Sequence, residues 1–196
     1  SFGPLPEGWP TDSPLPQEHR TVTLSQRVID VLAQRTEALD ERLLGCAVLD
    51  APHALERDHV LAADVRDALA ALTPEAGGDE RPEPPLWFIG PRGSGLVPMA
   101  AHVASLAGRR LLRVRVERWL HLPRRPEPGE LVRDALLGHR ALVLDWCDLD
   151  DTLLLERDPR TLALDLLHEC ETLCREFGVP VYLLSHHPLK LLRLHA

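Results

Sequence analysis

The segment that most restricts the fold is residues 86–99, which read Leu-Trp-Phe-Ile-Gly-Pro-Arg-Gly-Ser-Gly-Leu-Val-Pro-Met. Four apolar residues typical of a buried strand come first, Gly90, Gly93 and Gly95 follow, and apolar residues with helical spacing then continue to Leu106. Glycines allow a loop to turn its backbone N–H groups inward, and a helix that begins there adds its positive end, which together suit phosphate groups. We therefore predict a strand, a glycine loop and a helix.

The loop resembles the phosphate-binding loop of the P-loop NTPases. Gly90 and Gly95 have the spacing of the signature G-x-x-x-x-G-K-[ST], but Leu96 stands at the lysine position and Val97 at that of the magnesium-binding hydroxyl. Pro98 follows and has no N–H to donate. Loss of the lysine contact alone costs about 1.5–3 kcal/mol. The resemblance implies a degenerate loop with no tightly bound cofactor, at most weak ATP or ADP binding, and no Mg²⁺; its residues are Gly90, Pro91, Arg92, Gly93, Ser94, Gly95, Leu96 and Val97.

Later strands extend the resemblance. The continuous apolar run that ends in Asp145 is typical of a buried parallel strand and looks like a Walker B strand. A complete predicted strand, residues 111–116, lies between it and the glycine loop, as in the division of P-loop proteins that contains the AAA+ ATPases. The next predicted strand, residues 179–184, ends at Ser185 in the place of the sensor residue. The chain is thus similar to an AAA+ core.

The resemblance makes two specific predictions for residues 86–196. The strand from Val179 should lie between the strands that begin at Leu86 and Ala141. No catalytic residue is expected, because Trp146 stands where active AAA+ members have the glutamate that activates water. Asp145 is then a Walker B-like residue and Ser185 a sensor-like residue without catalysis.

Three alternatives remain open at this point. A weakly binding or hydrolysing P-loop domain would use Arg92 and Asp145 as substitutes for the missing groups. A Rossmann dinucleotide-binding unit would use the three loop glycines, with Glu117 at the end of the next strand as the ribose acid. A zinc site would need residues that follow neighbouring strands without a recognised ligand spacing, and we predict none; these are Asp145, Cys147, His186 and His187.

The alternation of strands and helices predicts an α/β fold, a three-layer P-loop NTPase-like core with a parallel sheet, preceded by a small helical region. We divide the chain into a proline-rich arm (1–20), an N-terminal helical region (21–72), a linker (73–85) and the core (86–196). The helical region should contain two helices, from Thr23 to about Leu43 and from about Ala54 to Leu72. The core is expected to end before its fifth strand.

Composition narrows the partners and the compartment. The net charge is −8 and the sequence has no basic stripe, which argues against nucleic acid as a partner. The four cysteines do not form the dense framework of a secreted disulfide domain, so we expect reduced thiols and a cytoplasmic location. No stretch has the length of a membrane helix, and we expect no membrane partner.

From the resemblance we expect an N-terminal or internal fragment of a larger AAA+-type ATPase. It would act as a structural or regulatory assembly module beside an active ATPase domain, in the same polypeptide or in an oligomeric ring. The fragment itself would be inactive, whereas the parent protein would hydrolyse ATP.

Overall fold

A computed structural model describes residues 26–33, 38–50, 67–68, 71, 85–149 and 157–188. The predicted proline-rich arm lies outside these ranges. So do the predicted linker, apart from Pro85, and most of the predicted helix from Ala54 to Leu72. The structure therefore tests the predicted core and part of the helical region.

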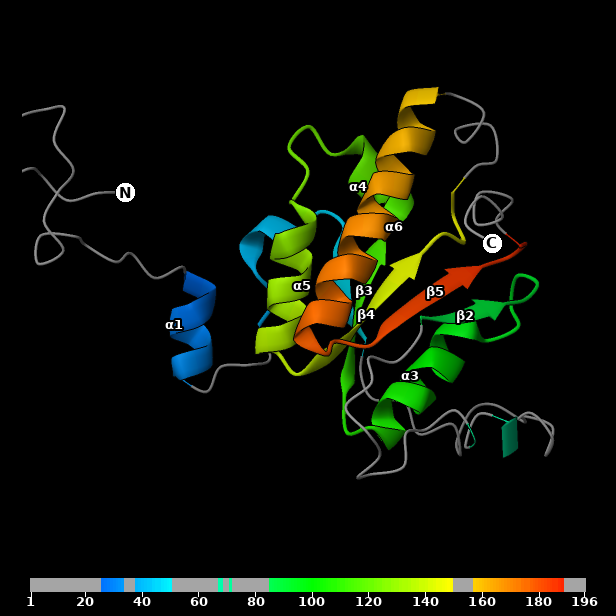
Figure 1. Cartoon of the computed structure of the whole chain (residues 1–196), viewed down its shortest axis with the longest axis horizontal. Coiled ribbons are helices and arrows are strands. Elements are labelled where there is room, and N and C mark those ends of the chain that lie inside the picture. Colours follow the sequence, from blue (N-terminus) through cyan, green and yellow to red (C-terminus); the bar gives the residue numbers. More distant parts are fainter. Residues whose placement is uncertain are drawn as a thin grey trace, which may run out of the picture.

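The described strands form one five-stranded sheet in the order β1-β3-β4-β5-β2 (Figure 1). Parallel pairing joins β3 to β4, β4 to β5 and β5 to β2, while β1 runs antiparallel to β3 at the opposite edge. The result is a mixed α/β fold with a mostly parallel sheet. The strands are β1 (Ala47–Asp50), β2 (Leu86–Ile89), β3 (Arg110–Arg115), β4 (Arg140–Asp145) and β5 (Val181–Ser185).

The strand order confirms one prediction and contradicts one alternative. β5 lies between β4 and β2, as the resemblance to AAA+ cores predicted. In a Rossmann unit the strand after the glycine loop's helix would pair with the loop's own strand. Here β2 pairs with β5, whereas β3 pairs with β1 and β4, so the Rossmann alternative and its ribose acid Glu117 are wrong.

Helices pack on both faces of the sheet because the central strands are apolar on both sides. Leu112 and Leu144 face a cluster formed with α4 (Val116–His121), α5 (Pro128–Leu137) and α6 (Arg157–Phe177). Neighbours one position away, such as Leu111 and Val143, face a second cluster formed with α3 (Leu96–Leu106). Among the described helices, none combines the length and apolar character needed to cross a membrane.

The prediction of a long helix from Thr23 to about Leu43 is wrong. The described part of this segment contains α1 (Gln26–Leu32) and a short 3-10 helix, η2 (Glu41–Leu43). β1 follows and adds to the sheet, with Ala47 opposite Val114. Helical spacing of apolar residues does not reveal these breaks, because the pairing partner of β1 lies far away in the sequence and Leu43 is buried by tertiary packing.

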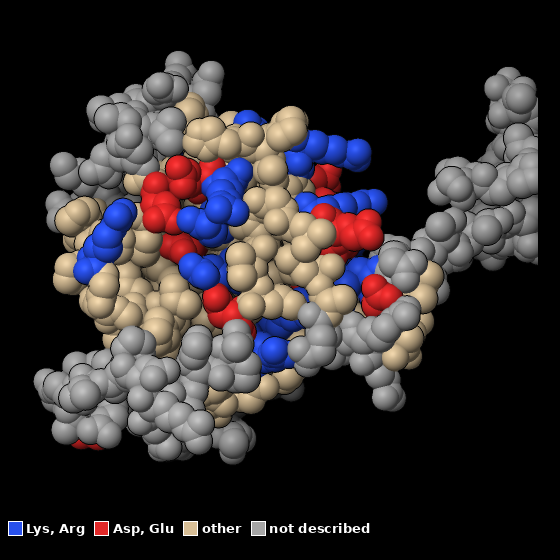
Figure 2. Space-filling model, turned by 180° about the vertical axis from the view of Figure 1, so that it is seen from behind, with Lys and Arg blue, Asp and Glu red and all other residues tan. Residues whose placement is uncertain are grey.

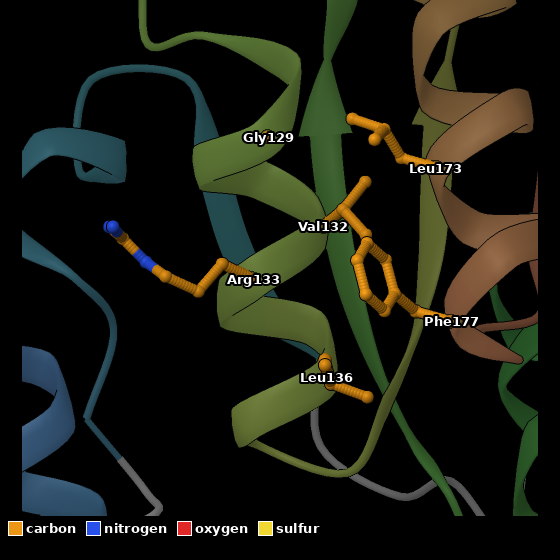
Figure 3. A pocket seen from close by; sticks show the side chains of 6 residues that line it. All are labelled: Gly129, Val132, Arg133, Leu136, Leu173 and Phe177. Carbon is orange, nitrogen blue, oxygen red and sulfur yellow. The ribbon is translucent and has the colours of Figure 1, made fainter.

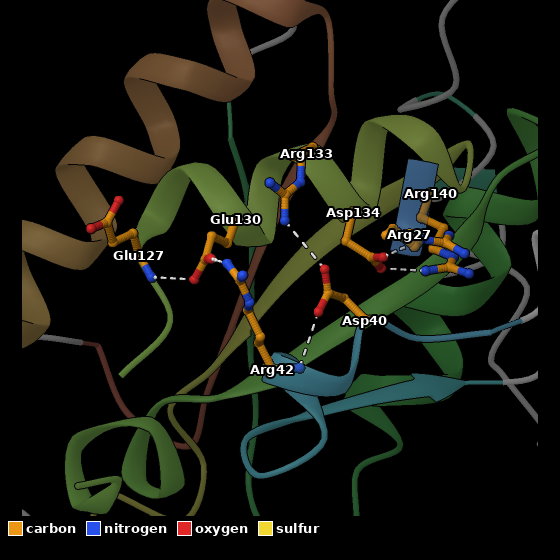
Figure 4. Close-up of polar contacts among 8 residues, drawn as sticks. All are labelled: Arg27, Asp40, Arg42, Glu127, Glu130, Arg133, Asp134 and Arg140. Atoms are coloured by element: carbon orange, nitrogen blue, oxygen red, sulfur yellow. Dashed lines mark hydrogen bonds and ion pairs between the residues drawn. The ribbon is translucent and has the colours of Figure 1, made fainter. Parts of the chain in front are cut away.

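Ion pairs attach this N-terminal segment to α5 (Figure 4). The Asp134 carboxylate is fully buried and lies 2.5 Å from Arg27 Nε of α1 and 2.5 Å from Arg140 Nη1 at the start of β4. Arg140 Nη2 also donates to the Ala38 carbonyl at 3.0 Å. Because one carboxylate serves two buried guanidinium groups, Asp134 holds α1, β4 and α5 together. Two further pairs lie nearer the surface: Arg133 with Asp40, and Arg42 with Glu130.

Replacing Asp134 by alanine should destabilise the protein by about 3–5 kcal/mol, because it removes the carboxylate that faces two buried guanidinium groups. The measurement is urea unfolding followed by circular dichroism. Glu171→Ala is the matched control, since it removes a carboxylate from the exposed pair between Glu171 and Arg175 on α6 and should cost less than about 1 kcal/mol. Equal small losses in both variants would contradict the role of Asp134.

Candidate functional site

The glycine loop connects the end of β2 to the start of α3. Gly93 and Gly95 have φ angles of 85° and 77°, in the left-handed region that residues with a Cβ rarely adopt. Gly95 is the N-cap of α3 and its carbonyl accepts the first helical hydrogen bond, from Met99 N at 3.0 Å. The predicted strand, loop and helix are therefore present, and two of the three loop glycines are required by backbone conformation.

Side chains from the loop itself pack against its first glycine. A Cβ atom on Gly90 would lie 2.6 Å from Ser94 Oγ and 3.2 Å from Leu96 Cδ2, so a larger residue here would require the Ser94 side chain to move. Leu96 is 6% exposed and belongs to the apolar cluster under α3, and Val97 packs against the same cluster. The two residues that differ from the P-loop signature thus contribute to the hydrophobic core.

Two amide donors of this loop are used within the protein. Ser94 N donates to the Pro91 carbonyl at 3.0 Å, which closes a turn within the loop. Pro98, in the first turn of α3, has no N–H. Gly90 N donates to the Ser185 carbonyl at 3.2 Å, and the His186 ring Nδ1 donates to the Gly90 carbonyl at 3.0 Å. The loop is thereby fixed to the end of β5.

Asp145, the predicted Walker B-like acid, ends β4 and is 6% exposed. Its Oδ1 accepts from Cys147 N at 3.0 Å, and its Oδ2 accepts from Arg113 Nη1 at 3.2 Å. Arg113 also forms a two-point contact with Asp50 of β1, at 2.8 Å from Nε and 3.1 Å from Nη2. One guanidinium therefore joins carboxylates from β1 and β4 across β3.

In this group a single guanidinium faces two carboxylates. Burial lowers the pKa of Arg113, but its hydrogen bonds with Asp50 and Asp145 outweigh burial, so the pKa is raised and the side chain stays a cation. Burial, followed by the charge of Asp145, raises the pKa of the Cys147 thiol to about 12. Cys147 is therefore neutral at physiological pH. Asp145 faces a permanent positive charge, and a Mg²⁺ ion bound by this carboxylate would have to displace Arg113.

A second ion pair lies beyond the ends of β3 and β4. Arg115 Nη2 lies 2.5 Å from Asp148 Oδ2, and this hydrogen bond lowers the pKa of Asp148, with smaller contributions from the charges of Arg92 and His186. Arg92 of the exposed part of the loop therefore lies in the field of this carboxylate. Figure 2 shows acidic and basic side chains interleaved on the face seen from behind.

Ser185, the predicted sensor-like residue, is buried and has partners within the protein. Its hydroxyl accepts from Trp87 Nε1 at 2.9 Å and donates to the His187 carbonyl at 2.8 Å. The hydroxyl therefore links β2 to the end of β5. The structure thus places the glycine loop, Asp145 and Ser185 at the carboxyl ends of neighbouring strands, but the Asp145 carboxylate and the Ser185 hydroxyl are both bonded to other parts of the chain.

Sequence reasoning missed Arg113 and Arg115. Both follow the two-residue period of a strand with one polar face, since they alternate with Leu112 and Val114 in β3. This alternation in the sequence indicates a strand that has charged residues on one face of the sheet. Their partners were not predictable, because Asp50 lies in a strand that the sequence analysis assigned to a helical region. Among the residues that the structure describes, no group of three or more His, Cys, Asp or Glu side chains could hold a metal ion.

Comparisons with known proteins add little. No protein-family model matches the chain, and no curated protein matches it in sequence. Among solved structures, AMPPCP-bound DnaA from Aquifex aeolicus aligns with 11% identity and a TM-score of 0.36, covering 70% of this chain. The alignment spans 44% of the DnaA chain, less than half of its length. A TM-score this low supports no conclusion about the function of this chain.

Replacing Arg113 by methionine should create a cation site that the native protein lacks. The carboxylates of Asp50 and Asp145 would then face each other without the guanidinium, and paired carboxylate oxygens suit Mg²⁺ or Mn²⁺. We expect millimolar Mn²⁺, at constant ionic strength, to raise the melting temperature of Arg113→Met by about 2–4 °C and to leave the native protein unchanged. An equal response of both proteins would contradict the interpretation that Arg113 occupies the cation position.

Proposed function

We propose that this chain is a degenerate, three-layer P-loop-like module of an AAA+-type ATPase, and that its function is structural or regulatory. The observation that carries the proposal is the contact between Arg113 and Asp145. In an active site of this kind the acid at the end of the strand orders a metal ion beside the phosphates. Here a guanidinium from the neighbouring strand contacts that acid, so the carboxylate already has a positively charged partner within the chain.

The geometry of the loop supports the same proposal. Leu96 and Val97 pack in the core instead of offering an ammonium and a hydroxyl. Trp146, at the position of the water-activating glutamate, is 3% exposed and belongs to the apolar cluster on the other face. A hydrolytic mechanism would need three missing polar groups to be replaced at once, and Arg92 is the one charged residue within the loop sequence.

An assembly role fits the contacts that the chain makes between its own strands at the site. Ion pairs and hydrogen bonds within the chain make the connections between strands at the site: Arg113 joins β1, β3 and β4, and Ser185 joins β5 to β2. Such a module would pack beside an active ATPase domain, in the same polypeptide or in a ring, and transmit its conformational changes. Nucleic acid, a membrane and a tightly bound cofactor are not part of the proposal.

The first test is a thermal-shift titration with ATP and ADP, each with and without Mg²⁺. A ligand at one hundred times its dissociation constant adds about 2.7 kcal/mol, and at about 2–4 °C per kcal/mol the shift would be easy to see. We expect shifts below about 1 °C at millimolar nucleotide. An ATP-specific, Mg²⁺-dependent shift that Arg92→Ala abolishes would overturn the proposal and favour a functional nucleotide site.

The regulatory part needs the intact parent polypeptide. Arg113→Met in this module should change the rate of ATP hydrolysis by the active domain, because the strands would lose their connection while the distant catalytic residues stay intact. Glu171→Ala, on the exposed face of α6, is the control and should leave that rate unchanged. An unchanged rate in both variants, with the parent folded and assembled, would argue against transmission through this site.

A further inference from the structure

An apolar groove runs along the seam between α5 and α6, on the face of the sheet opposite α3. It encloses a hollow of about 220 Å³. Val132 and Phe177 point toward each other across it, and the guanidinium of Arg133 is turned away, toward Asp40 (Figure 3). The groove therefore has an apolar interior; its lining residues are Gly129, Val132, Arg133, Leu136, Leu173 and Phe177.

Large apolar side chains at this groove are exposed to solvent. Leu136 is 43% exposed and Phe177 is 50% exposed, and both lie at the same opening. Large apolar side chains gathered on a surface mark a contact site more often than isolated ones do. The hollow is smaller than the ~300–1,000 Å³ of typical small-molecule sites. An aromatic side chain on an extended peptide suits it better than a nucleotide or a cofactor.

The sequence of the chain itself contains such a peptide. Residues 2–10 read Phe-Gly-Pro-Leu-Pro-Glu-Gly-Trp-Pro, in which prolines favour the polyproline II conformation and Phe2, Leu5 and Trp9 supply apolar side chains. Proline-rich segments dock in apolar grooves at a low entropic cost, because the bound conformation already exists in the free peptide.

Helix α1, which follows this segment in the sequence, is attached to α5, one of the two helices that line the groove. Arg27 of α1 is paired with Asp134 of α5, so the chain that precedes α1 begins beside one wall of the groove. About 17 residues separate Trp9 from Gln26, and at about 3.1 Å each they span roughly 50 Å. An α-helix with its side chains is about 10–12 Å across, so this length easily passes around α5. Attachment at this point also gives a high effective concentration.

We propose that residues 2–10 of the same chain dock in the groove between α5 and α6, with Trp9 in the hollow between Val132 and Phe177. The groove is then an intramolecular docking site for the proline-rich arm. This inference does not depend on the proposed function, because the groove lies on the opposite face of the sheet from Arg113 and α3.

The test is disulfide trapping in the full chain. Gly8→Cys places a thiol beside Trp9 without removing it, and Leu136→Cys places the second thiol at the groove. The matched control pairs Gly8→Cys with Leu106→Cys, because Leu106 is 45% exposed on α3, on the other face of the sheet. The native thiols interfere little, since Cys46, Cys170 and Cys174 are buried, and burial raises the pKa of the half-buried Cys147 to about 12.

We expect the Gly8–Leu136 pair to form an intramolecular disulfide at least ten times faster than the Gly8–Leu106 pair under mild oxidation. Gly129→Leu should remove this preference by filling the groove. At Gly129 a new Cβ meets only Leu173 Cδ1, at 4.0 Å, so the helix tolerates the change. Trp9→Ala should remove the preference without altering the groove.

Three results would overturn the proposal. Equal rates for the two cysteine pairs, with native circular dichroism spectra, would mean that the arm does not select the groove. Disulfides formed mainly between two molecules would assign the groove to a second copy of the chain instead. Retention of the preference in both Gly129→Leu and Trp9→Ala would show that proximity alone, and not docking, produces the disulfide.

Discussion

The burial of β4 on both faces is the constraint on which the rest of the structure depends. All six of its residues are buried, β3 and β5 flank it, and apolar clusters cover each face. A parallel strand in this position must be apolar along its length. It can carry charge only at its ends, and those are Arg140 at the start and Asp145 at the end. Each end therefore needs a partner of opposite charge.

The charged residue at each end of β4 is paired with a residue of opposite charge, and the two pairs attach different parts of the chain to the sheet. Arg140 pairs with Asp134, which also binds Arg27 and so attaches the N-terminal segment to the core. Asp145 pairs with Arg113, which also binds Asp50 and so attaches β1 to the sheet. Burial of a charge is costly unless it is paired. At the carboxyl end, that pairing uses the acid that would otherwise be available to a metal ion.

Much of the core was predictable because local patterns there agree with the tertiary structure. Apolar runs marked β2, β4 and β5, the glycines marked the loop, and the resemblance to AAA+ cores gave the position of β5 in the sheet. The N-terminal region was not predictable in this way. β1 has four residues, only two of which face the main apolar cluster, and it exists because β3 offers an edge. The short helix α4 was missed as well, since six residues give too little helical periodicity.

The sequence by itself determined the strand, glycine loop and helix, together with the presence of Leu96 and Val97 where the signature has a lysine and a hydroxyl. Both are local properties, because the left-handed backbone conformation of the loop glycines and the identity of a residue do not depend on tertiary contacts. Only the tertiary structure decided what the polar residues do. Arg113 contacts Asp50 and Asp145 across three strands, and Ser185 contacts Trp87. These partners are 63, 32 and 98 positions apart, and such pairs become visible only when strand order and register bring them together.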